Sequence, residues 1–93
     1  MIGEFVLVRT YSAGVHCGTL ADCSGTVVVL TDARRVWRWK GANSLNELSI
    51  HGCDEEYSRI SESVPKIMLT QGIEVIPCSP KAQKNLSRSR WTS

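Results

Sequence analysis

The segment TVVVL, residues 26–30, constrains the fold most strongly, because its four consecutive apolar residues leave the strand no polar face. Such a strand is buried on both sides, or it buries one side in a contact between subunits. The chain has 93 residues, enough for one small domain, and domains of this size bury only a modest fraction of their surface. We therefore expect a single domain built around this strand, and a homo-oligomer that covers further apolar surface.

Further runs of β-forming residues lie on both sides of this strand. Residues 4–11 and 15–22 precede it, and Gly18 inside the second run predicts a bulge or a sharp bend. Asp32 and Ala33 interrupt the apolar run, and later strands are predicted at 34–40, 65–70 and 73–77, with an ambiguous short strand within 57–64. This order predicts a mainly β fold, a small antiparallel barrel of the SH3-like or Sm-like kind that occupies residues 1–80.

One helix is predicted as an insertion in this barrel. Ser44 and Glu47 have the spacing of a capping box, and Gly52 suits the end of a helix that begins near residue 44. Residues 81–93 are polar and basic, with Arg90 and Trp91 near the end, and are predicted to form a tail whose first part can make a turn of helix.

The N-terminal residues and the hydropathy of the chain indicate where in the cell the protein is located. The first twelve residues, MIGEFVLVRTYS, contain an acidic residue and no long apolar run, so we expect no signal peptide. No stretch approaches the roughly 20 apolar residues of a membrane span, and we expect no membrane contact. The chain should therefore lie in the cytosol, with its four cysteines reduced.

Catalysis and metal binding are not predicted. The cysteines form no C-x-x-C pair, so we expect no metal and no cofactor. His16 and Cys17 are adjacent on a predicted strand and point to opposite faces, which prevents them from sharing a proton. The acidic run 54–56 is typical of a solvated loop. We expect a protein that is not an enzyme.

The stretch TDARRVWRWKGA, residues 31–42, holds two of the three tryptophans and four cations. Strand alternation places Arg35, Trp37 and Trp39 on one side, and the other cations with Val36 on the opposite side. In one interpretation the indoles supply core mass and the cations are a solvated face. In the other, the cations form an electropositive stripe with one indole at its rim, which suits base stacking and phosphate binding.

The second interpretation predicts a ligand site, extended by two residues of the neighbouring hairpin. Its ligand would be a nucleotide, a cyclic oligonucleotide signal or single-stranded nucleic acid. The predicted site residues are Tyr11, His16, Arg34, Arg35, Trp37, Arg38, Trp39 and Lys40.

Two segments resemble the motifs of Sm-like proteins. VLVRTYSAGVHCGTLADCSGTVVVL is similar to the first motif and IMLTQGIEVIPC to the second, and this resemblance implies a ring-like or other cyclic homo-oligomer. The positions that line the RNA base pocket in that family hold Ser24, Val28 and Gln71 here. The resemblance therefore extends to the scaffold and not to the uridine pocket.

A broader resemblance covers most of the chain. The segments 11–18, 33–42 and 73–78 are similar to those of short proteins of unknown function from tailed phages and prophages. This resemblance implies a phage accessory protein in the host cytoplasm that counters host defence. The alternative is a protein-binding inhibitor of a host defence complex, or a minor virion structural protein.

Overall fold

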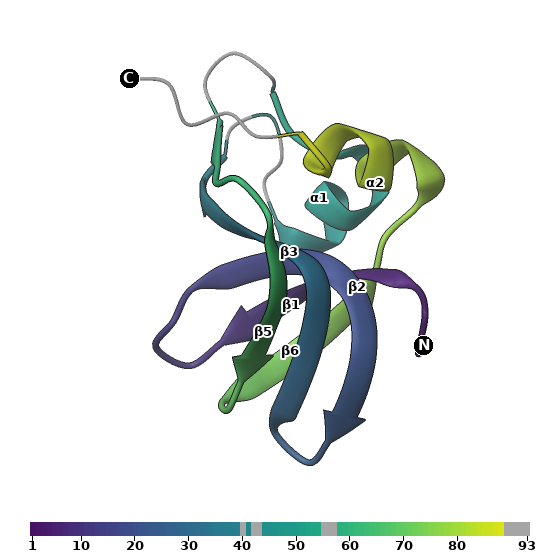
Figure 1. Ribbon diagram of the computed structural model, residues 1–93. Coiled ribbons are helices and arrows are strands. Elements are labelled where there is room, and N and C mark those ends of the chain that lie inside the picture. Colours follow the sequence, from purple (N-terminus) through teal and green to yellow (C-terminus); the bar gives the residue numbers. More distant parts are fainter. Residues whose placement is uncertain (40, 42–43, 55–57, 89–93) are drawn as a thin grey trace.

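Six strands and two short helices form the described part of the computed structural model, which comprises residues 1–39, 41, 44–54 and 58–88 (Figure 1). The predicted mainly β fold is confirmed. The elements are β1 (Phe5–Thr10), β2 (Val15–Ser24), β3 (Val27–Arg38), α1 (Leu45–His51), β4 (Arg59–Ile60), β5 (Val64–Leu69), β6 (Gly72–Pro77) and α2 (Pro80–Leu86).

The strands form one antiparallel sheet in which β3 is shared by three partners. The order is β4-β3-β2-β1-β6, and β5 pairs with β3 alongside its first half, from Val28 to Ala33. β5 and β6 lie at opposite edges of this ladder, although only Thr70 and Gln71 separate them in sequence. The sheet therefore curls until its edges meet at that turn. Among the described residues no ladder joins β5 to β6, so the sheet is open and the predicted closed barrel is not confirmed.

Both faces of the sheet carry a core, because β1 is apolar on both sides. Val6 and Val8 enter a cluster that also contains Leu69 of β5 and Val75 of β6, as expected inside a sheet that curls around its core. Phe5 belongs to a second cluster on the other face, beneath the two helices, which lie side by side (Figure 1). The central segment is buried as predicted, with Val28, Val29 and Leu30 at most 8% exposed.

The predicted interruption at Asp32 is a bulge inside one long strand. Asp32 has φ of 48°, and the pairing of β2 with β3 changes register opposite it, between Cys17 and Thr19. Gly18 lies at this shift, where a Cβ atom would come within 2.9 Å of the Thr31 carbonyl oxygen. The bulge predicted from Gly18 is thus confirmed, and glycine is required by the close approach of the two backbones.

The predicted helix is confirmed, with ends at Leu45 and His51. The Ser44 hydroxyl oxygen accepts a hydrogen bond from the Glu47 amide at 3.2 Å, as the capping box requires. Gly52 ends the helix with φ of 77° and donates its amide to the Leu48 carbonyl oxygen at 2.9 Å. Neither described helix is long and apolar enough to cross a membrane.

The packed core continues past the predicted domain boundary at residue 80. Ala82 and Leu86 of α2 are fully buried against the sheet and α1. The Asn85 side chain adds two hydrogen bonds of 3.0 Å to the backbone of Cys53, one as acceptor and one as donor. The chain as far as Leu86 thus belongs to one folded unit, and Arg90 and Trp91 lie outside the described residues.

Replacing Leu86 with alanine should lower the free energy of unfolding by roughly 2–5 kcal/mol, because a buried side chain leaves a cavity. Lys81→Ala, on an exposed position of the same helix, is the control and should cost less than about 0.5 kcal/mol. Urea unfolding measures both values. Equally small losses in the two variants would mean that α2 is not part of the core.

Candidate ligand-binding site

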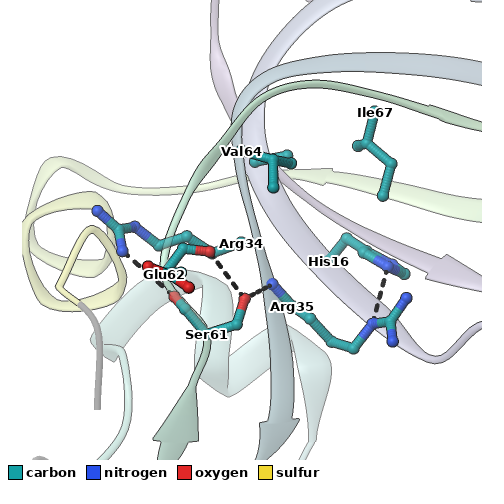
Figure 2. Close-up of a pocket in the computed structure, with 8 residues that line it drawn as sticks. His16, Arg34, Arg35, Ser61, Glu62, Val64 and Ile67 are labelled. Atoms are coloured by element: carbon teal, nitrogen blue, oxygen red, sulfur yellow. Dashed lines mark hydrogen bonds between the residues drawn. The ribbon is translucent and has the colours of Figure 1, made fainter. Parts of the chain in front are cut away.

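Two cavities on the surface share one residue, Arg35. The larger has a volume of about 430 Å³ and lies between the β1–β2 turn and the end of β3. The smaller, of about 300 Å³, lies where β3 passes from its pairing with β5 to its pairing with β4 (Figure 2). The larger cavity is lined by Ser12, Ala13, Gly14, Val15, Arg35, Val36, Trp37 and Trp39, and the smaller by His16, Ala33, Arg34, Arg35, Ser61, Glu62, Val64 and Ile67.

Trp37 lies on β3 and Trp39 directly follows it, and each fits a different one of the two interpretations of the sequence. Trp37 is 58% exposed, and the guanidinium carbon of Arg38 lies 5.4 Å from its ring centroid, within cation–π range. Trp39 is partly buried against the helix-side core. A register shift between Val36 and Arg38 interrupts the alternation at this point. One indole thus supplies core mass and the other lies at the surface, while both line the larger cavity.

Contacts to neighbouring strands hold Arg35 in place. Its Nε–H donates to His16 Nε2 at 3.3 Å, across the β2–β3 pair. Its backbone amide donates to the Ser61 hydroxyl oxygen at 2.8 Å, and its carbonyl oxygen accepts from the Ser61 amide at 3.0 Å. Ser61 thereby bonds to the β3 backbone in the interval between β4 and β5, where the ladder has no regular pairs.

His16 is a buried, neutral histidine. Its residue is 1% exposed, and burial, followed by the charge of Arg35, lowers the pKa of the imidazole from 6.5 to about 4. Because Nε2 accepts from the arginine, the single proton of the neutral ring is on Nδ1. That Nδ1 atom is buried and has no hydrogen-bond partner in the described part of the chain.

Two guanidinium groups at this surface, those of Arg35 and Arg38, have no carboxylate partner within salt-bridge distance in the described part of the chain, whereas Arg9 pairs with Glu74 at 2.8 Å. The Arg34 Nη1 atom donates to the Ser61 carbonyl oxygen at 3.2 Å and lines the smaller cavity. The guanidinium groups of Arg35 and Arg38 favour an anionic ligand.

The remaining predicted site residues lie apart from the two cavities or cannot be placed. Tyr11 is 79% exposed on the β1–β2 turn, and its ring lines neither cavity. Lys40 lies outside the described residues. The structure thus brings His16 and Arg34 together with Arg35 at one cavity, and Trp37 and Trp39 with Arg35 at the other.

Four residues of the smaller cavity were not predicted as site residues. Ser61, Glu62 and Val64 lie in the segment 57–64, whose pattern was ambiguous, and Ile67 begins the segment that resembles the second Sm-like motif. All four are far from Arg35 in sequence, so no spacing connects them to it.

The side chains around the two cavities are suited to binding a ligand through hydrogen bonds and charge. His16 and Cys17 point to opposite faces, as predicted: the histidine lines the smaller cavity and the thiol belongs to the helix-side core. Burial raises the pKa of the Cys17 thiol to about 12, which keeps it from acting as a nucleophile. Among the residues that the structure describes, no three histidine, cysteine or acidic side chains gather as a metal site.

A comparison with known protein families assigns the chain to one of them. Residues 3–86 match DUF6948, a domain of unknown function. The chain belongs to the DUF6948 family. The match includes α2, in agreement with a folded unit that ends at Leu86. No curated protein and no solved structure matches this DUF6948 chain.

The His16 ring should remain neutral down to about pH 4, because its pKa is lowered from 6.5 to about 4. The unfolded chain takes up this proton near pH 6.5, so the free energy of unfolding should fall as the pH drops from about 6.5 to about 4. An NMR titration of the ring measures the pKa. Arg35→Gln should raise it but leave it below 6.5, since burial remains. A wild-type pKa of 6.5 would contradict a buried ring.

Proposed function

We propose that this DUF6948 domain is a non-enzymatic binding module for a nucleotide-type ligand: a nucleotide, a cyclic oligonucleotide signal or single-stranded nucleic acid. The observation that carries the proposal is the exposed Trp37 indole, with the Arg38 guanidinium beside its ring, at the wall of a cavity that Arg35 also lines. An aromatic ring next to Arg35 and Arg38, which have no carboxylate partner among the described residues, suits a ligand that has both a planar base and a phosphate.

Each part of this surface has a distinct role in the proposal. A base stacks on the indole of Trp37, a contact worth roughly 1–3 kcal/mol. The phosphate accepts hydrogen bonds from the terminal nitrogens of Arg38 and Arg35, and the His16 contact at Nε keeps the Arg35 side chain in position. Trp39, packed against the core, supports the cavity wall.

The biological setting is also part of the proposal. The resemblance of three sequence segments to short tailed-phage proteins supports a phage accessory role that counters host defence in the host cytoplasm. The order of β6, β1, β2, β3 and β5 supports a small Sm-like or SH3-like barrel, because the two edge strands are joined by two residues.

A second candidate is a protein-binding role, as an inhibitor of a host defence complex or as a minor virion part. It is favoured by exposed apolar side chains on the two edge strands, Val64 and Met68 of β5 and Ile73 of β6. Within the described residues, each of these strands has one edge without a hydrogen-bonded neighbour. Open edges with apolar side chains are typical of protein contacts, including a homo-oligomer.

Replacing Trp37 with alanine should weaken the binding of ATP and of a short oligothymidylate about 5- to 150-fold, the equivalent of one stacking contact. Arg38→Ala should also weaken binding and reduce its salt dependence, because one phosphate contact is lost. Isothermal titration calorimetry at two salt concentrations measures both effects.

Lys66→Ala is the matched control, since Lys66 is an exposed cation on β5, away from both tryptophans. It should leave the affinity nearly unchanged. Equal affinity of the wild type and of both site variants would reject this surface, and no binding by the wild type would reject the function.

The homo-oligomer has its own test. Native mass spectrometry of the wild type should show a defined oligomer, and Met68→Glu should shift it toward monomer, because a charge replaces an apolar side chain that is 63% exposed. Lys81→Glu, at an exposed position of α2 away from both edge strands, is the control. A wild-type monomer at every concentration would rule out an assembly through β5.

A further inference from the structure

The smaller cavity shares Arg35 with the tryptophan surface, and all its other lining residues differ. It lies where the ladder on β3 is broken: Ala33 pairs with Val64 of β5, Val36 pairs with Ile60 of β4, and the chain between these partners bulges outward. The cavity of about 300 Å³ is large enough for a small organic molecule.

One wall of this cavity is formed by His16 and Arg35. The Nε–H of Arg35 donates to His16, and its terminal nitrogens have no hydrogen-bond partner among the described residues. The His16 side chain is 1% exposed, and its Nδ1 atom is buried without a partner in the described part of the chain. An apolar residue would serve better at position 16 if this position had only to pack, since a buried unpaired donor is destabilising. The histidine instead orients Arg35, whose terminal nitrogens can donate to an acceptor oxygen.

The opposite wall is apolar. Figure 2 shows Val64 and Ile67 of β5 on one side of the cavity, and the His16–Arg35 pair on the other. Ala33 is also part of the lining, and its short side chain leaves space that a larger residue would fill. A branched or cyclic apolar group fits between these surfaces.

The charge of the lining limits the ligand. The lining includes the cations Arg34 and Arg35 and the carboxylate Glu62. A carboxylate ligand brings one negative charge near Glu62, whereas a phosphate with two charges would be repelled more strongly.

We propose that this cavity is a second ligand site, which takes a small monocarboxylate with a branched or cyclic apolar body. The carboxylate accepts from the terminal nitrogens of Arg35, and the body lies against Val64 and Ile67. The inference does not depend on nucleotide binding, because it concerns the other cavity and a different chemical class; Arg35 is the one residue that both proposals use.

The test uses 4-methyl-2-oxopentanoate, which has a carboxylate, an adjacent carbonyl and a branched body. Added to the full chain, it should cause saturable NMR shifts of the Arg35 Nε–H, the His16 ring and the β5 amides, with a dissociation constant in about the micromolar-to-millimolar range. The neutral 4-methylpentanamide and inorganic phosphate should each bind about tenfold more weakly or not at all.

Two variants localise the site. Arg35→Gln should weaken binding about tenfold or more, since a charge-assisted hydrogen bond is lost. Val64→Phe, at a residue 43% exposed where a larger ring can be accommodated, should fill the cavity and also abolish binding. Amide spectra of both variants check that they fold. Trp37→Ala should leave carboxylate binding unchanged, and Val64→Phe should leave ATP binding unchanged, so either proposal can fail alone.

Three results would overturn the inference. The first is no saturable shift in the wild type at about 10 mM carboxylate, well above the range expected for a ligand of this size. The second is binding of the amide or of phosphate as tight as that of the carboxylate. The third is unchanged affinity in a folded Val64→Phe variant.

Discussion

Burial of β1 on both faces is the constraint on which the rest of the structure depends. Val6 and Val8 require the sheet to curl around one core, and Phe5 and Leu7 require a cover on the other side. The curl brings β5 and β6 close enough for a two-residue turn, and the cover is supplied by α1 and α2. A chain of this length can satisfy both faces of one strand only by using nearly all of its residues.

Local patterns predicted most of the elements, because local chemistry determines them. The capping box at Ser44, the helix end at Gly52 and the bulge at Gly18 all depend on neighbours within a few residues or on one backbone approach. The extent of the folded unit was harder to predict. The stretch from residue 81 reads as a basic tail, since its exposed face is polar, and the two residues that anchor α2, Ala82 and Leu86, are too few to form a clear pattern.

The site was predictable only in the half that lies on consecutive residues. Alternation along β3 identified its cations and indoles. It could not predict that Trp37 is exposed and Trp39 partly buried, because the register shift near Arg38 depends on the partner strand β4. The orientation of Arg35 depends on His16 and Ser61, which come from two other parts of the chain. No spacing rule connects these three residues, so the smaller cavity emerges only from the folded sheet.

The pairing of β1 with β6 has a consequence for how the protein folds. Val6 pairs with Pro77, so the two strands come from distant parts of the sequence. Such a non-local pairing makes folding slow relative to helical proteins of the same length. Until β6 reaches its position, the apolar β1 has only β2 and β3 to cover it. Partly folded copies are therefore exposed to each other through that uncovered strand, where they can aggregate.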